Sequence, residues 1–139
     1  MPKGYKAMVA EAMAEIVTLT PQQAAAKLND PEVVFVDIRD PRELERDGMI
    51  PNALHATRGM LEFWIDPESP YHRKVFSEDK EFIFYCAGAL RSALATKTAQ
   101  DMGLKKVAHI EGGFGEWKKA GLPVAAWQPK VPKAEGEKK

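Results

Sequence analysis

A strand–turn–helix unit around the single cysteine constrains this sequence more than any other feature. Phe82–Tyr85 is a run of apolar and aromatic residues, which predicts a buried strand. The run leads into Cys86 and the small residues Ala87–Ala89, and a helical pattern begins near Arg91. Backbone N–H groups of such a loop converge at the helix N-terminus, where the helix dipole adds positive potential. We therefore expect this loop to stabilise the thiolate form of Cys86.

Short apolar runs and helical segments alternate along the rest of the chain. Val33–Val36 predicts a second buried strand and Val107–Ile110 a third, with shorter strands expected at 16–19 and 54–56. This alternation predicts an α/β fold with a central, mostly parallel five-stranded sheet and helices on both faces. Functional sites of such sheets lie beyond the carboxyl ends of the strands, which is where the cysteine follows its strand.

Three segments organise the chain. Residues 1–15 predict an N-terminal amphipathic helix, because apolar residues recur at helical spacing on one side of it. We interpret this helix as packing on the folded domain, and a role in binding a partner stays open. The domain itself is expected over residues 16–126. Residues 127–139 are mostly Pro, Lys, Glu, Ala and Gly and are predicted to form a disordered tail.

Composition argues against several classes of function. Twenty basic residues balance twenty acidic ones, so charge gives no indication of a nucleic-acid or membrane partner. No apolar run approaches the roughly 18 residues of a membrane span. One cysteine cannot form an internal disulfide, which either favours a reducing compartment or leaves the compartment open. The prediction is a soluble cytoplasmic protein with no nucleic-acid and no membrane partner.

The three histidines do not combine with Cys86 into a known pattern. His55, His72 and His109 lack metal-ligand spacing with one another or with the cysteine, so no metal site and no cofactor are expected. Their spacing also gives no support to a cysteine–histidine protease. His109 lies inside a predicted strand and is interpreted as a hydrogen-bonded core histidine.

Four motifs together resemble the signatures of a rhodanese domain. In chain order they are Val36–Arg39, Gly48–Ala53, Cys86–Ser92 and Glu111–Trp117. The resemblance covers about residues 16–126, with Met49 and Asn52 standing where the family usually has His and Gly. It implies a rhodanese-like fold and a sulfurtransferase that carries sulfur as a persulfide on Cys86.

The resemblance also implies a two-step mechanism. The thiolate of Cys86 takes the outer sulfur of a small anionic donor such as thiosulfate and passes it to a thiol, cyanide or protein acceptor. Because the chain has no second cysteine, that acceptor must be external. The backbone of the loop would hold the charge of the persulfide. The predicted substrate-binding residues are Ala87, Gly88, Ala89, Leu90, Arg91 and Ser92.

Three other interpretations stay open for the cysteine. In the first, the cysteine is an inert buried side chain. In the second, it belongs to a sulfur carrier or regulatory binding module without turnover. In the third, it is the nucleophile of a cysteine-dependent phosphatase or arsenate reductase. Those enzymes hold their oxyanion in a Cys-x5-Arg loop, whereas Cys86 and Arg91 form a shorter Cys-x4-Arg loop that suits a single sulfur atom better.

Four more residues are candidates for supporting roles. Asp37 and Arg39 are expected just behind the loop, with Asp37 pairing with Arg91 or the loop amides; a salt bridge at a capped strand end is the alternative. Arg58 and Trp64 are candidate substrate contacts. A solvated surface arginine and a core tryptophan are the corresponding alternatives.

Overall fold

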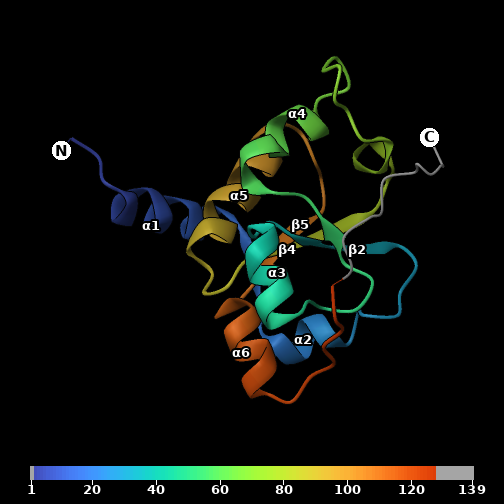
Figure 1. Ribbon diagram of the computed structural model, residues 1–139. Coiled ribbons are helices and arrows are strands. Elements are labelled where there is room, and N and C mark those ends of the chain that lie inside the picture. The colour runs from blue at the N-terminus through green and yellow to red at the C-terminus, as the bar shows by residue number, and fades with distance from the viewer. Residues whose placement is uncertain (1, 128–139) are drawn as a thin grey trace.

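Five parallel strands form the central sheet of the computed structural model, which describes residues 2–127 (Figure 1). The strands are β1 (Val17–Leu19), β2 (Val33–Asp37), β3 (Leu54–His55), β4 (Glu81–Tyr85) and β5 (Val107–Ile110). Their order across the sheet is β1-β5-β4-β2-β3, and every neighbouring pair is parallel. This confirms the predicted α/β class and its five-stranded sheet.

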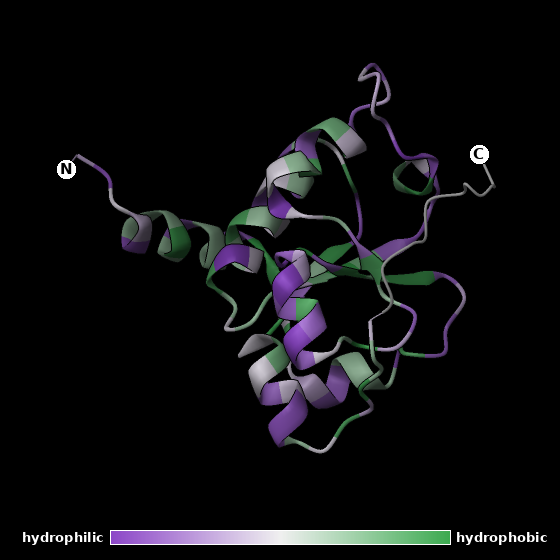
Figure 2. Cartoon of the chain, in the orientation of Figure 1, coloured by the Kyte–Doolittle hydropathy of each residue, from purple (hydrophilic) through white to green (hydrophobic). Residues whose placement is uncertain are grey.

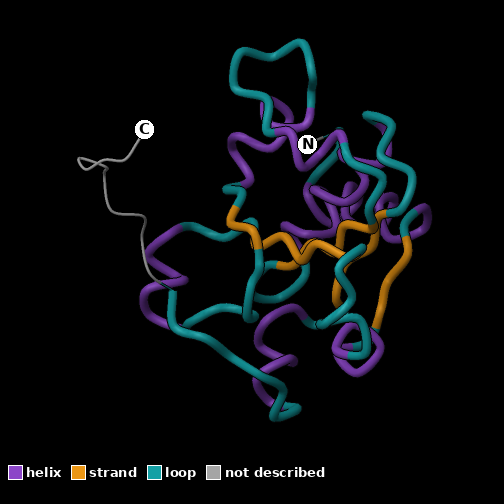
Figure 3. The backbone as a smooth tube through the Cα atoms, turned by 90° about the vertical axis from the view of Figure 1, so that its right-hand side faces the viewer, coloured by secondary structure: helices purple, strands orange, loops and turns teal. Residues whose placement is uncertain are grey.

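Helices cover both faces of the sheet, which Figure 3 shows from the side. They are α1 (Tyr5–Glu15), α2 (Pro21–Ala25), α3 (Pro41–Asp47), α4 (Leu61–Ile65), α5 (Leu90–Asp101) and α6 (Gly113–Lys119). Two short 3-10 turns, η1 (Arg58–Met60) and η2 (Lys74–Ser77), precede α4 and β4. Hydrophobic residues predominate along the strands, while α3 and α6 carry many hydrophilic residues (Figure 2).

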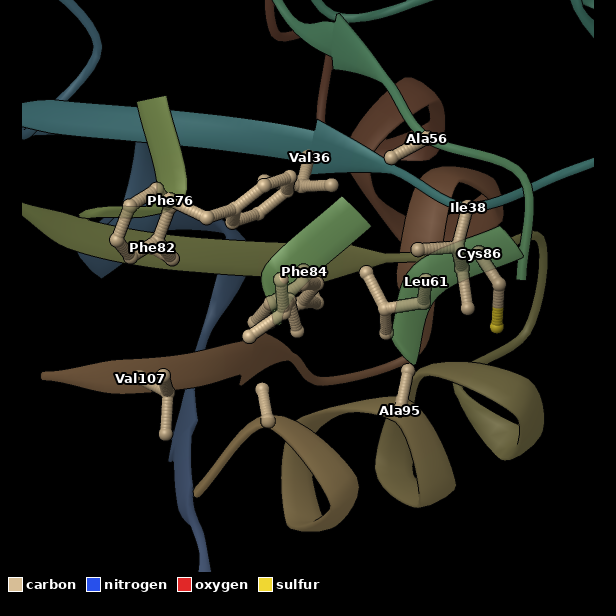
Figure 4. Packing of buried hydrophobic residues seen from close by; sticks show 12 residues of the cluster. Val36, Ile38, Ala56, Leu61, Phe76, Phe82, Phe84, Cys86, Ala95 and Val107 are labelled. Atoms are coloured by element: carbon tan, nitrogen blue, oxygen red, sulfur yellow. The ribbon is translucent and has the colours of Figure 1, made fainter. Parts of the chain in front are cut away.

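Successive side chains of β4 enter two separate cores because they alternate between the faces of the sheet. Phe84 packs in a core with Ala95 of α5 (Figure 4). Tyr85 lies on the other face, in a core with Trp117 of α6. Cys86 follows the strand and returns to the first core, where it is 1% exposed. With both faces covered, β4 reads as a continuous apolar run rather than as an alternating pattern.

The N-terminal helix forms, but most of its apolar side chains stay exposed. Helix α1 packs against α5, and Ala12 is its buried residue. Tyr5, Met8 and Met13 are 59%, 44% and 42% exposed. The helix expected from the periodicity forms and packs on the domain through α5, while much of its apolar side stays open to solvent.

The predicted tail lies outside the described residues, except for its first residue. The ring of Trp127 packs edge-on against that of His55, with 5.8 Å between the ring centroids. Within residues 2–127, every helix is too short or too polar to cross a membrane.

A buried ion pair fixes the chain where β2 ends. Arg39 donates to the Asp37 carboxylate from Nη2 at 2.8 Å and from Nε at 3.0 Å, and both side chains are at most 1% exposed. The guanidinium also donates to the Gly48 carbonyl at 2.7 Å and lies 4.4 Å from the centroid of the Phe114 ring. The pair therefore joins β2 to the turn after α3 and to α6. It is the predicted strand-end salt bridge, and Asp37 does not pair with Arg91.

Replacing Arg39 with methionine should lower the free energy of unfolding by about 3–5 kcal/mol, because Asp37 is left as an unpaired buried charge. The double variant Asp37→Asn/Arg39→Met should lose less than Arg39→Met alone, since no charge then remains buried. Urea denaturation of the wild type and both variants at neutral pH measures these differences. A double variant that is no more stable than the single one would show that the pair acts through packing rather than charge.

Candidate active site

The sulfur of Cys86 takes the place of a helix cap at the start of α5. Its Sγ accepts N–H hydrogen bonds from Ala89 at 3.1 Å and from Ser92 at 3.3 Å. Ser92 is the third residue of α5, a position whose N–H commonly bonds the side-chain oxygen of the N-cap residue. The N-cap residue is Ala89, which has no polar side chain, so the sulfur supplies the missing acceptor. Two N–H donors and the helix dipole thus stabilise a negative charge on Sγ.

The N-terminus of α6 holds the same loop through its carbonyl groups. The N–H groups of Phe114 and Gly115 donate to the carbonyl oxygens of Cys86 at 2.8 Å and Ala87 at 3.0 Å. Gly113 approaches so closely that a Cβ at this position would lie 2.5 Å from the Cys86 carbonyl oxygen. Its φ of +62° also favours glycine. Glycine at position 113, within the Glu111–Trp117 motif, is therefore needed for helix α6 to reach the loop.

The loop backbone itself is strained at Ala89. This residue has φ +85°, a left-handed conformation that costs a residue with a Cβ roughly 1 kcal/mol or more. The conformation turns the Ala89 N–H toward Sγ. Ala87, Gly88 and Leu90 are exposed, and a Cβ at Gly88 would meet no atom within 4 Å. The predicted binding loop therefore borders solvent on its outer side, while the N–H groups of Ala89 and Ser92 are the ones that contact the sulfur.

A buried hydrogen-bond chain lies beneath the loop. The Ser92 hydroxyl is 3.0 Å from Nδ1 of His109, and Nε2 of His109 is 3.1 Å from the Thr18 hydroxyl. The Thr96 hydroxyl donates to the Ser92 carbonyl at 2.7 Å. Burial lowers the pKa of His109 to about 4, so the ring is neutral at neutral pH. The expected core histidine is confirmed, and its link from β1 and β5 to the residue that contacts the sulfur is new.

Arg91 finds its partner on α3. Its Nη1 and Nη2 donate to Oε2 and Oε1 of Glu43 at 2.9 and 3.0 Å, a two-pronged ion pair. Hydrogen bonding to Arg91 is the main cause that lowers the pKa of Glu43. Glu43 also forms a capping box with Asp40 at the start of α3. No spacing in the sequence points to the pair, because its members lie 48 positions apart.

The two candidate substrate contacts do not form hydrogen bonds with the loop. Arg58 donates to Glu62 at 2.9 Å and to the Thr98 hydroxyl at 3.4 Å. Trp64 packs against the first core, and the guanidinium of Arg73 lies 5.2 Å from the centroid of its ring. Both side chains are held by contacts with residues outside the cysteine loop, so the proposed reaction does not use them.

Neither the surface hollow at the β3 edge nor the placement of metal-ligating side chains among residues 2–127 points to another site for the chemistry of Cys86. A hollow of about 690 Å³ lies at the β3 edge and is lined by residues that include Met49, His55, Arg73 and Trp127. It contains no residue of the cysteine loop. Among residues 2–127, no group of three or more His, Cys, Asp or Glu side chains is placed to hold a metal ion.

The chain belongs to the family of the rhodanese-like domain, whose model matches residues 20–120. A sulfurtransferase of Allochromatium vinosum is 30% identical over 106 residues, which cover 76% of this chain and 91% of that protein. A tRNA uridine(34) hydroxylase of Cronobacter sakazakii is 35% identical over 107 residues. These residues cover 71% of this chain but 29% of the hydroxylase, so the likeness concerns one part of that protein.

Two solved structures extend the comparison. A Rhodopseudomonas palustris protein, described as of unknown function and as a possible tyrosine phosphatase, is 63% identical with a TM-score of 0.87. The match covers 89% of this chain and 96% of that one. The polysulfide-sulfur transferase homodimer of Wolinella succinogenes is 34% identical with a TM-score of 0.67, and the match covers 90% and 89% of the two chains. The resemblance found in the four motifs is confirmed at the level of family and fold.

Replacing Gly113 with alanine should lower the free energy of unfolding by about 2–4 kcal/mol, because the new Cβ meets backbone oxygens and the left-handed conformation becomes strained. Gly59→Ala is the matched control, since a Cβ at Gly59 would meet nothing within 4 Å. Urea denaturation of the two variants measures the difference. Equal losses for the two substitutions would mean that α6 does not approach the loop as closely as described.

The buried His109 should make the protein less stable in acid. Its pKa is about 4 in the folded protein against an ordinary value of 6.5, so the unfolded chain binds more protons between these pH values. The stability from this group is complete above pH 6.5 and is lost as the pH falls toward 4, with about 2–3 kcal/mol disappearing between pH 7 and pH 4.5. Urea denaturation of the wild type and of His109→Gln at both pH values tests this. The variant should show the shallower pH dependence, and parallel curves would contradict the assignment.

Proposed function

We propose that this protein is a sulfurtransferase that carries a sulfane sulfur on Cys86 from a donor to an external acceptor. The observation that carries the proposal is the pair of N–H groups aimed at Sγ from the N-terminal end of α5. These donors suit a sulfur atom that bears a negative charge. Family membership and the names of the A. vinosum and W. succinogenes relatives support the same chemistry.

The proposed reaction has two displacement steps. With thiosulfate as donor, the Cys86 thiolate attacks the outer sulfur, the S–S bond of thiosulfate breaks, and sulfite leaves with the electron pair of that bond. Cys86 then bears a persulfide anion, Cys86–S–S⁻. In the second step cyanide or a thiolate attacks the outer persulfide sulfur, and thiocyanate or a new persulfide leaves while the Cys86 thiolate returns. Negative charge is conserved in each step, and no oxidant or reductant is required.

Burial of the sulfur limits which donors reach it. Cys86 is 1% exposed, and its carbonyl group is fixed by α6. A donor must therefore present its sulfur at the end of a narrow group rather than within a bulky one. The acceptor must come from outside, because the sequence contains one cysteine.

Intact mass spectrometry tests the proposal most directly. After exposure to thiosulfate and removal of excess donor, the wild type should gain the mass of one sulfur atom and lose it on treatment with a reductant. Cys86→Ser should gain none while unfolding in urea with the same cooperativity as the wild type. Sulfur added to the serine variant would show that another group carries it.

Steady-state assays separate the enzyme from a sulfur carrier. An enzyme turns over many equivalents of thiosulfate and cyanide, whereas a carrier gives one persulfide and negligible further rate. The description of the R. palustris protein makes phosphate-monoester hydrolysis the second candidate. Cys86-dependent release of p-nitrophenol from p-nitrophenyl phosphate, without any persulfide, would favour that candidate over sulfur transfer.

A further inference from the structure

The rim of the cysteine loop carries a cation that is already neutralised. Both terminal nitrogens of Arg91 donate to the carboxylate of Glu43, whose side chain is 19% exposed against 43% for Arg91. Glu43 Oε2 also accepts the N–H of Asp40 at 3.1 Å. Three N–H donors therefore fix the carboxylate, and its lowered pKa keeps it charged at neutral pH. Of the five N–H groups of an arginine, two are occupied by this carboxylate.

The position of Arg91 in the chain brings its ion pair with Glu43 next to a residue that binds the sulfur. Arg91 immediately precedes Ser92, whose N–H contacts Sγ. Hydrogen bonding to Glu43 is the largest cause that raises the pKa of Arg91. The electrostatic interaction with Cys86 acts in the same direction. The guanidinium thus lies within electrostatic reach of the sulfur, and the Glu43 carboxylate is bound directly to that guanidinium.

Most other charges of α3 are paired with each other, and the remaining one, Glu45, is exposed to solvent. Arg42 pairs with Asp40 at 3.2 Å, and Arg46 pairs with Asp47 at 3.0 Å. The buried pair behind the loop, Asp37 and Arg39, is likewise neutral as a unit. The attraction for an anion at Sγ therefore comes mainly from backbone N–H groups and the α5 dipole rather than from free cations.

We infer that Glu43 determines donor specificity by cancelling the charge of Arg91, so that the loop disfavours doubly charged sulfur donors. This inference rests on the proposed function and names its substrate class: sulfane donors with a single negative charge, such as organic persulfides and thiosulfonates. Because Glu43 cancels the charge of Arg91, a donor with two charges loses twice the attraction that a donor with one charge loses, unless it displaces Glu43 from Arg91. A donor with one charge depends less on Arg91, because the backbone N–H groups at Sγ are suited to a single negative charge.

Two donors that differ in charge but share the reacting bond make the test sharp. Thiosulfate carries two negative charges and releases sulfite, whereas methanethiosulfonate, CH3SO2S⁻, carries one and releases methanesulfinate. In both cases the Cys86 thiolate takes the outer sulfur as the S–S bond breaks, and the leaving group keeps the electron pair. The ratio of kcat/KM for the two donors therefore reports the effect of donor charge.

Glu43→Gln should raise kcat/KM for thiosulfate roughly five- to twentyfold and for methanethiosulfonate by no more than about threefold, with the difference shrinking as salt is added. Glutamine suits the third position of a capping box, so α3 keeps its start while losing the charge. Glu45→Gln is the matched control, because it removes the same charge from an exposed position of the same helix. It should leave the ratio unchanged.

Arg91→Ala provides the opposite change. Removing the cation leaves Glu43 as an unpaired carboxylate at the rim, so thiosulfate should lose more activity than methanethiosulfonate. In the double variant Glu43→Gln/Arg91→Ala, the ratio should return toward that of the wild type. Equal effects of Glu43→Gln on both donors, or the same shift in Glu45→Gln, would overturn the inference.

A second measurement keeps this outcome distinct from failure of the proposed function. Iodoacetate carries one charge and iodoacetamide none, and the single cysteine makes alkylation specific to Cys86. Glu43→Gln should raise the rate with iodoacetate relative to iodoacetamide, whether or not sulfur is transferred. Absence of a persulfide with either donor would reject the proposed function alone. An unchanged alkylation ratio would reject the role of Glu43 alone.

Discussion

The hydrogen bonds from the start of α5 to the Cys86 sulfur are the interaction on which the site depends. Helices α2 and α3 begin with oxygen caps, supplied by Thr20 and Asp40. Helix α5 has 12 residues, and its N-cap residue Ala89 offers no side-chain acceptor. The sulfur therefore accepts hydrogen bonds from N–H groups at the start of the helix that would otherwise lack a side-chain acceptor. The same contact that completes the helix would also stabilise a negative charge on the sulfur, so the structural role and the proposed chemical role coincide at one atom.

The sulfur can take this place because the loop is held from two sides. Helix α6 binds the carbonyl groups of Cys86 and Ala87, and Gly113 allows it to approach. On the inner side, His109 of β5 bonds the hydroxyl of Ser92, whose N–H contacts Sγ. The left-handed Ala89 persists within this arrangement because its surroundings on both sides fix the backbone.

Local patterns in the sequence were sufficient for the elements but not for the contacts between them. The buried strands could be predicted because a parallel strand covered on both faces is apolar throughout, and the caps of α2 and α3 follow from spacings of three residues. The pairing of Glu43 with Arg91 depends on how α3 and α5 meet beyond the sheet. The contact of Gly113 with the loop likewise depends on β5 lying beside β4. Strand order sets both, and no local pattern encodes it. Helical spacing predicted α1, yet spacing cannot tell whether a neighbour covers Tyr5 or Met13.

The charge balance of the site matches the chemistry proposed for it. In that reaction the thiolate and the persulfide each carry a single negative charge, so the loop faces the same charge before and after the sulfur arrives. Fixed N–H donors can serve both states without reorganising, which is the advantage of preorganised dipoles over mobile side chains. A free cation beside the sulfur would instead favour whichever donor or leaving group carries the most charge, including the sulfite released in the first step. By pairing Arg91 with Glu43, the protein keeps the field at the loop close to what one sulfur anion requires.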